Sequence, residues 1–134
     1  MNERYDVAAI GNAIVDLIHP VSDAFLLEHG IAKSVMTLVD EFRAAQLIAA
    51  LPGASQSSGG SAANTMAGLA SFGAKGCFVG KVKDDVLGRA FADDLSAMGV
   101  RFATGKAQDG PSTACCVIAV TPDGMTVYVA DSSN

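Results

Sequence analysis

The sequence lacks three features: a cluster of basic residues, a long apolar run and a paired set of cysteines. Nine Lys and Arg are scattered among 14 Asp and Glu, which gives the 134 residues a net charge of −5. Nucleic-acid surfaces need clustered Lys and Arg to neutralise phosphates, so we expect no nucleic-acid partner. Gly, Asp, Lys or Pro interrupt every apolar run well before the roughly 20 residues of a membrane span, so we expect no membrane partner.

The cysteines and histidines suggest no metal or disulfide chemistry. Cys77, Cys115 and Cys116 are odd in number and have no C-x-x-C spacing, which excludes a disulfide framework and a zinc site. Residues 2–6 do not resemble the start of a signal peptide. We therefore expect a cytoplasmic protein with reduced core thiols.

Two pairs of adjacent acids, at 84–85 and 93–94, also fail to suggest a metal site. Neighbouring residues on a helix point in different directions, and helix capping explains such acids better than Mg²⁺ binding. His19 and His29 are isolated from each other and from any nucleophile. We predict no metal ligands in this chain.

The most informative segment is residues 58–73, with the sequence S-G-G-S-A-A-N-T-M-A-G-L-A-S-F-G. A Gly-Gly pair lets the backbone approach a small polar molecule, and the helix that follows begins with unpaired amides. An Asn in the first turn, Asn64, can then bind hydroxyls. The spacing of Ala63, Met66 and Ala70 predicts an apolar helix face that packs on a sheet. The alternative is a glycine-rich loop before an ordinary core helix.

Strands and helices alternate along the chain, which is typical of an α/β fold. Residues 54–58 suggest a loop of small residues, and T-P-D-G at 121–124 predicts a hairpin. The strand at 77–82 should lie parallel to the first strand, because the connection between them is a helix. The predicted strands are 5–10, 14–18, 34–39, 77–82, 113–120 and 125–130, and the predicted helices start at 22, at 40, at the glycine pair 59–60 and at 84 or 85.

Three motifs stand in the order found in one enzyme family: G-N-A-I-V-D at 11–16, G-G-S-A-A-N at 59–64 and V-G-K-V-K-D-D-V-L-G at 79–88. The chain resembles the PfkB, or ribokinase-like, carbohydrate kinases, and within them the adenosine kinase-like branch. Those enzymes are more than twice as long. Residues 1–134 thus resemble the N-terminal portion of one ribokinase-like kinase domain.

The resemblance implies a mostly parallel sheet flanked by helices, with a small β-sheet lid over the substrate. The lid strands would be approximately 14–18, 34–39, 113–120 and 126–130. Lid strands with an exposed edge could also pair two copies of the chain as a homodimer.

The resemblance also implies ATP-dependent phosphorylation of a hydroxyl on a ribonucleoside such as adenosine, or on a sugar. The residues that match the family's acceptor-binding set are Asn12, Asp16, Gly59, Gly60, Ser61 and Asn64. An ionised Asp16 can accept hydrogen bonds from two adjacent ring hydroxyls. The alternative for Asp16 is a turn or edge-strand carboxylate. Ser61 stands where ribokinase-type sequences usually carry Lys, which favours a nucleoside over a free sugar.

The family's catalytic Asp lies in a G-A-G-D segment, and no such segment occurs before Asn134. ATP and Mg²⁺ serve the full-length family, but the residues implied to bind them are not in this chain. We therefore expect an acceptor-binding part with no catalytic residue, inactive by itself. The alternative is a non-catalytic module, derived from a kinase fragment, that binds a small molecule or forms dimers.

Overall fold

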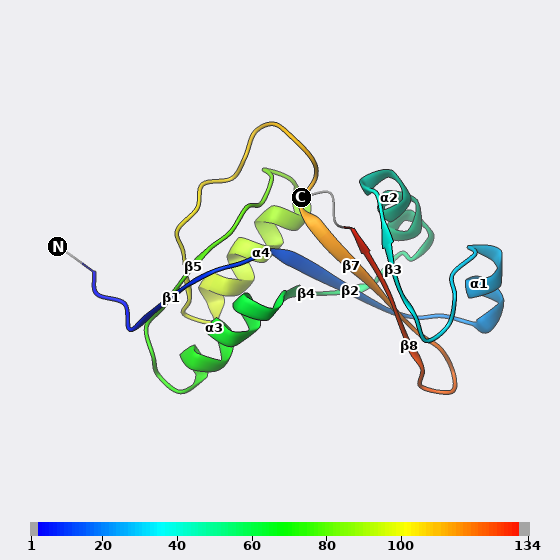
Figure 1. Ribbon diagram of the computed structural model, residues 1–134, viewed down its shortest axis with the longest axis horizontal. Coiled ribbons are helices and arrows are strands. Elements are labelled where there is room, and N and C mark those ends of the chain that lie inside the picture. The colour runs from blue at the N-terminus through cyan, green and yellow to red at the C-terminus, as the bar shows by residue number, and fades with distance from the viewer. Residues whose placement is uncertain (1–2, 132–134) are drawn as a thin grey trace.

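The computed structural model describes residues 3–131, which form four helices and eight strands (Figure 1). In chain order the elements are β1 (Val7–Ile10), β2 (Ile14–Pro20), α1 (Asp23–Glu28), β3 (Met36–Val39), α2 (Glu41–Ala50), β4 (Ser55–Gly59), α3 (Ser61–Ser71), β5 (Gly76–Val79), α4 (Val86–Ala97), β6 (Arg101–Phe102), β7 (Ala114–Val120) and β8 (Thr126–Asp131).

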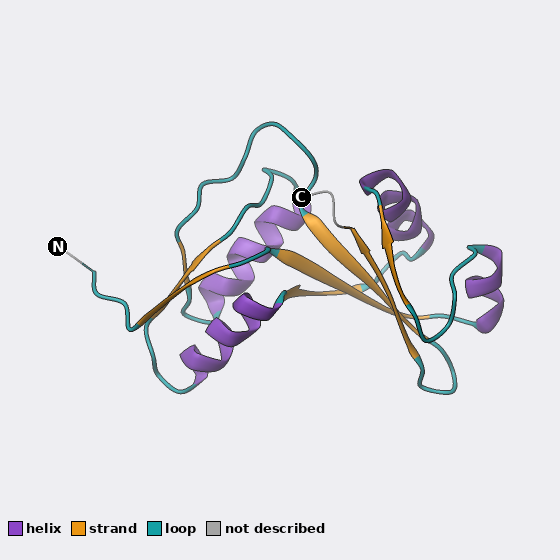
Figure 2. Cartoon of the chain, viewed as in Figure 1, coloured by secondary structure: helices purple, strands orange, loops and turns teal. Residues whose placement is uncertain are grey.

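The strands form two sheets, seen at opposite sides of Figure 2. A three-stranded parallel sheet has the order β1-β5-β6, and β5 runs parallel to β1 as predicted. A five-stranded mixed sheet has the order β3-β8-β7-β2-β4, in which β2 is parallel to β7 and antiparallel to β4. The α/β class with parallel strands and flanking helices is confirmed.

Helices α3 and α4 cover the same face of the three-stranded sheet. A Cβ on Gly76 would lie 3.2 Å from the sulfur of Met66 in α3, and the ring of Phe78 lies 5.6 Å from that of Phe91 in α4. Gly76 and Phe78 are two residues apart on β5, so they face the same side. On the other side Ile10 is 84% exposed.

One apolar core joins the two sheets. It contains Val15 and Leu17 of β2, Leu47 of α2, and Phe91 and Leu95 of α4, all nearly inaccessible to solvent. Burial of these side chains is the main favourable contribution to folding. No helix within residues 3–131 has the length and apolar character that crossing a membrane requires.

The four strands predicted for the lid lie together in the five-stranded sheet, with slightly different bounds. The strand predicted at 34–39 begins only at Met36, because Ser34 has a φ of 63°, which a strand cannot accommodate. The prediction of a loop at 54–58 was wrong, since β4 pairs along β2. Whether this sheet acts as a lid stays a prediction.

The third motif fixes the start of α4 and the start of β7 through one carboxylate, that of Asp85. Its Oδ1 accepts hydrogen bonds from the Gly88 amide at 2.7 Å and from Thr113 Oγ1 at 2.8 Å, and its Oδ2 accepts one from the Thr113 amide at 2.9 Å. Burial raises the pKa of Asp85, but the hydrogen bonds from Thr113 and Gly88 outweigh it, and the net pKa is lowered.

We expect Asp85→Ala to lower the free energy of unfolding by about 1–3 kcal/mol, because it removes a helix cap and the carboxylate that accepts from the Thr113 backbone amide. Asp84→Ala is the matched control, since the Asp84 carboxylate only pairs with Arg89 at the surface. Urea unfolding at neutral pH measures both. The loss should begin to shrink as the pH falls below the unfolded-state pKa of about 3.9, and should vanish as the pH falls through the lower folded-state pKa of Asp85. Equal losses for both variants would contradict this role.

Candidate functional site

The site predicted from the first two motifs lies where α3 begins. Gly60 is the N-cap residue of α3, with φ 93° and ψ 141°, a conformation essentially restricted to glycine. Glycine has no side chain to cap the helix, so the amides of the first turn remain available to a ligand. A helix N-terminus also favours partial negative charge, such as that of a hydroxyl oxygen.

Asp16 of β2 and Gly59 of β4 are diagonal neighbours across the strand pair, since Gly59 lies directly opposite Ile14 and Asp16 opposite Ser57. A Cβ on Gly59 would lie 2.5 Å from Oδ2 of Asp16 and 2.7 Å from its Cγ, closer than real Cβ atoms come. Any residue other than glycine at this position would push the carboxylate away. Gly59 is buried while Asp16 is half-buried. The first glycine of the pair therefore makes room for the carboxylate.

Gly60 and Asn12 form the second close approach. A Cβ on Gly60 would lie 2.6 Å from the backbone oxygen of Asn12. The two glycines are thus required for different reasons, Gly59 for space and Gly60 for both space and conformation. This approach brings the segment after β1 against the start of α3.

Ser61 and Asn64 occupy the exposed side of the first turn of α3. The backbone amide of Asn64 donates to the Gly60 carbonyl at 2.9 Å, which places Asn64 one helical turn after the glycine pair. Ala63 and Met66 are 1% exposed and form the buried face of the same helix. The structure thus brings all six predicted residues to one region, and their role in binding stays a prediction.

Burial raises the pKa of Asp16 above its ordinary value. Across the strand pair, Asp16 lies opposite Cys116 of β7. Burial, and after it the Asp16 carboxylate, raise the pKa of the Cys116 thiol to about 11. Cys116 is therefore a neutral thiol at neutral pH and not an activated nucleophile. Its proximity to Asp16 was not predicted.

We expect Asp16→Asn to raise the melting temperature of the chain at neutral pH, because desolvation disfavours the ionised carboxylate in the folded state. The raised folded-state pKa means that this penalty is absent below the unfolded-state pKa of about 3.9 and is complete above the folded-state pKa. Melting curves from pH 3 to pH 7 should diverge as the pH rises. Curves that diverge toward low pH would show that Asp16 is stabilised by a partner.

The third motif packs directly on the first. A Cβ on Gly80 would lie 2.7 Å from the backbone oxygen of Gly11, and the Gly11 amide donates to the Val79 carbonyl at 3.1 Å. The motif at 79–88 therefore supports the segment that carries Asn12. Within residues 3–131 no group of three or more His, Cys, Asp or Glu could hold a metal ion, so we assign no Mg²⁺ ligands.

Solved structures of two bacterial kinases are similar to this chain. A probable sugar kinase from Rhizobium etli CFN 42 is 42% identical, with a TM-score of 0.80 over 95% of this chain and 38% of that one. The adenosine kinase from Sinorhizobium meliloti is 44% identical, with a TM-score of 0.79 over 96% and 39%. The chain thus spans about two fifths of the length of these relatives.

A more distant structure, the adenosine kinase of Trypanosoma brucei brucei, shares the fold, with a TM-score of 0.81 at 23% identity over 97% of this chain and 41% of that one. No curated protein sequence matches the chain significantly. Residues 6–134 match the pfkB family carbohydrate kinases, a match that covers nearly the whole chain. The chain therefore belongs to the pfkB family of carbohydrate kinases.

Proposed function

We propose that this chain carries the acceptor-binding part of an ATP-dependent kinase that phosphorylates a hydroxyl of a ribonucleoside such as adenosine. One observation carries this proposal: the half-buried Asp16 carboxylate lies against Gly59, beside the helix start at which Gly60 meets Asn12. A carboxylate and two amide side chains around a helix N-terminus can bind adjacent hydroxyls and fix their orientation.

Each side chain has a distinct role in this proposal. Asp16 accepts hydrogen bonds from two neighbouring hydroxyls, which are charge-assisted and therefore strong. The side-chain amides of Asn12 and Asn64 can each donate and accept hydrogen bonds, and the backbone amide of Ser61 contributes a further donor. Residues outside this chain would supply the ATP and Mg²⁺ sites and the catalytic base. The reaction would take place in the cytoplasm.

The acceptor is proposed to be a nucleoside first and a free sugar second. The two bacterial relatives have nearly equal identity to this chain, and one is called an adenosine kinase and the other a probable sugar kinase. Ser61 favours the nucleoside, because it brings no positive charge toward a strongly polar or phosphorylated sugar.

A chimera tests this proposal. Residues 1–134 would replace the matching segment of the Sinorhizobium meliloti adenosine kinase, and ADP release would be followed with adenosine and with ribose. We expect the chimera to turn over adenosine at an ordinary kinase rate, about 1–100 per second, and the chain alone to show no turnover. Turnover by the chain alone, or a folded chimera inactive with both acceptors, would contradict the proposal.

A second candidate is a dimerising module. Strand β3 is an edge of the five-stranded sheet, and its side chains Met36 and Leu38 are 62% and 61% exposed, on the same sheet face as the 44% exposed Tyr128. An open edge with exposed apolar side chains favours pairing with another strand. Sedimentation of the chain and of its Leu38→Lys variant tests this function. The charged side chain should prevent dimerisation and leave acceptor binding intact.

A further inference from the structure

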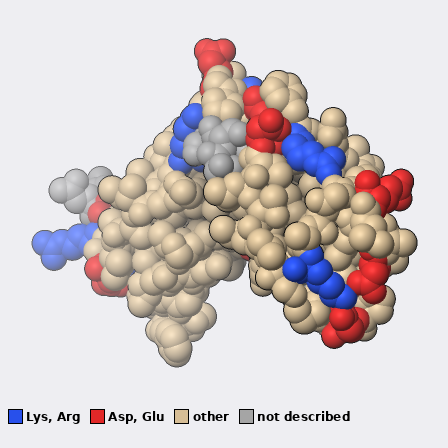
Figure 3. All heavy atoms as spheres, turned by 45° about the vertical axis from the view of Figure 1, so that its right-hand side comes forward, with Lys and Arg blue, Asp and Glu red and all other residues tan. Residues whose placement is uncertain are grey.

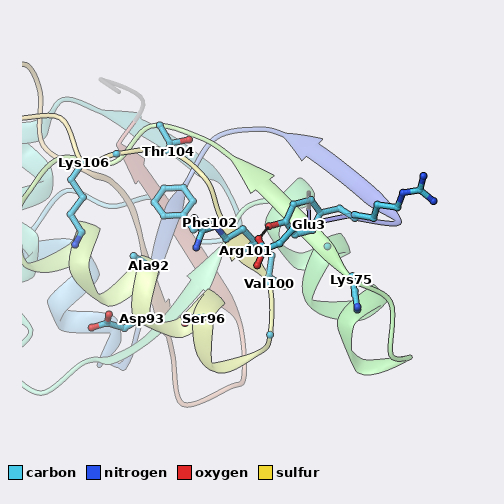
Figure 4. A pocket seen from close by; sticks show the side chains of 15 residues that line it. Glu3, Lys75, Ala92, Asp93, Ser96, Val100, Arg101, Phe102, Thr104 and Lys106 are labelled. Atoms are coloured by element: carbon cyan, nitrogen blue, oxygen red, sulfur yellow. Dashed lines mark hydrogen bonds between the residues drawn. The ribbon is translucent and has the colours of Figure 1, made fainter. Parts of the chain in front are cut away.

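A pocket of about 760 Å³ lies away from the acceptor site, between α4, β6 and the N-terminal segment (Figure 4). Its volume is in the range of sites that hold small molecules, roughly 300–1,000 Å³. Its lining is drawn from four segments of the chain, within residues 3–5, 75–76, 92–96 and 99–106.

Most of the pocket lies at the end of the three-stranded sheet opposite to the acceptor site, while its residues 104–106 extend past the end of β6. Gly76 and Arg101 are the first residues of β5 and β6, and Tyr5 precedes β1. Asn12, in contrast, follows the end of β1. The two sites share no residue, and only the Thr104 end of the pocket approaches the first motif, through Gly80.

The charge of this pocket is opposite to that of the chain. Four of the nine Lys and Arg residues line it, against two of the 14 acids, so its lining carries +2 while the whole chain carries −5. On the face of the molecule seen in Figure 3, by contrast, basic and acidic side chains alternate between broad uncharged areas. Positive side chains concentrated around a concave surface attract and retain anions.

No ion pair within the described residues 3–131 engages the Lys and Arg side chains of the lining. The ion pairs found within residues 3–131 engage Lys33 and Arg89, neither of which lines the pocket. The acids of the lining, Glu3 and Asp93, are already included in the sum of +2, and the Asp6 carboxylate, which accepts from the Lys75 backbone amide, adds one more negative charge. The pocket therefore retains a net positive potential.

The remaining lining adds hydrogen-bonding groups and an apolar surface. Lys75 and Lys106 lie at opposite ends of the pocket, with Arg101 and Phe102 between them (Figure 4). The Thr104 hydroxyl accepts a hydrogen bond from the Gly80 amide at 3.1 Å, so its own proton can still be donated. The Phe102 ring packs against Phe78 and Phe91, and because the residue is only half-buried it adds some apolar surface to the pocket.

We propose that this pocket binds a small molecule bearing phosphoryl groups, at a second site separate from the acceptor site. Lys and Arg are the side chains that bind phosphate oxygens most strongly, and several of them around one cavity suit a ligand with more than one negative charge. The Phe102 ring and the Thr104 hydroxyl suit a phosphorylated molecule with an organic part, such as a mononucleotide.

Titration of the ¹⁵N-labelled chain with pyrophosphate and with AMP tests this site. We expect saturable amide shifts at Gly76, Gly99 and Gly105, and tighter binding of AMP if the organic part contacts Phe102. Lys75→Gln and Arg101→Gln should each weaken binding by about tenfold, the effect of one charge-assisted contact. Arg89→Gln removes a positive charge outside the pocket and should change the Kd less than twofold.

Three results would overturn the proposal. One is the absence of saturable shifts with either anion, and a second is equal weakening by Arg89→Gln, which would indicate nonspecific attraction. The third is a set of shifts confined to Asn12, Gly60 and Asn64, which would place the anion at the acceptor site. The spectrum of each variant without ligand reports directly whether it is folded.

Discussion

Replacing Asp16 by alanine in the chimera is expected to lower kcat/KM for adenosine by about ten- to hundredfold, with little change in the affinity for ATP. The carboxylate would otherwise accept charge-assisted hydrogen bonds from the acceptor, worth about 1.5–3 kcal/mol. Asn64→Ala should act in the same direction and more weakly, because an uncharged amide makes weaker hydrogen bonds. Steady-state kinetics with ADP release as the readout measures both effects.

Asp23→Ala is the charge-matched control for this variant. Asp23 lies on α1, at the far right of Figure 1 and distant from α3, and its carboxylate is 62% exposed in an ion pair with Lys33. Its removal should leave kcat/KM unchanged. If Asp16→Ala and Asn64→Ala fold normally and phosphorylate adenosine and ribose as well as the parent chimera does, both are capping and turn residues.

A second large effect is expected for Gly60→Ala, which should lower the free energy of unfolding by about 2 kcal/mol or more. The positive φ of 93° is strained for any side chain, and the added Cβ would lie 2.6 Å from the backbone oxygen of Asn12. A backbone oxygen can move only if the segment after β1 moves as well. The variant should therefore also lose acceptor binding.

In the same helix, Gly68→Ala is expected to raise the free energy of unfolding, the opposite of the effect expected for Gly60→Ala. A Cβ on Gly68 would meet no atom within 4 Å, and the residue lies in the interior of α3. Alanine is favoured over glycine there by about 1 kcal/mol, so this variant should be more stable than the parent. Urea unfolding of both variants measures the difference. A loss of stability in both would mean that α3 tolerates no added methyl group.

Features set by neighbouring residues could be predicted from the sequence. Asp40 accepts from the Arg43 amide at 2.8 Å and begins α2, and Gly73, with φ 86°, follows the end of α3, both as the local patterns indicated. The Asp-Gly hairpin between β7 and β8 formed for the same reason. In each case the physical cause acts within a few residues.

Apart from the parallel β1–β5 pair, which the intervening helix indicated, features set by distant pairing could not be predicted. Strand β4 contains Ser and Gln side chains that are mostly exposed, so it lacks the alternating apolar pattern that indicates a strand. It is a strand because β2 pairs with it, and because the Asp94 carboxylate accepts a hydrogen bond from the Ser58 amide at 2.7 Å. The parallel pairing of β2 with β7 joins residues about 100 positions apart.

The candidate site combines both kinds of feature. The motifs indicated the six residues and the helix that begins at Gly60. The contact between Gly59 and Asp16 depends on the β2–β4 register, which sequence spacing does not specify. The basic pocket was missed because its residues come from four separated segments, none of which holds more than two positive charges.

The most direct measurement of the central claim compares kcat/KM for adenosine, 2′-deoxyadenosine and 3′-deoxyadenosine in the chimera, with and without Asp16→Ala. If Asp16 accepts hydrogen bonds from both ring hydroxyls, removal of either hydroxyl should cost the parent chimera about tenfold or more and cost the variant much less. If hydroxyl removal costs the parent and the variant equally, Asp16 does not bind the acceptor's hydroxyls, and the proposed acceptor site is wrong.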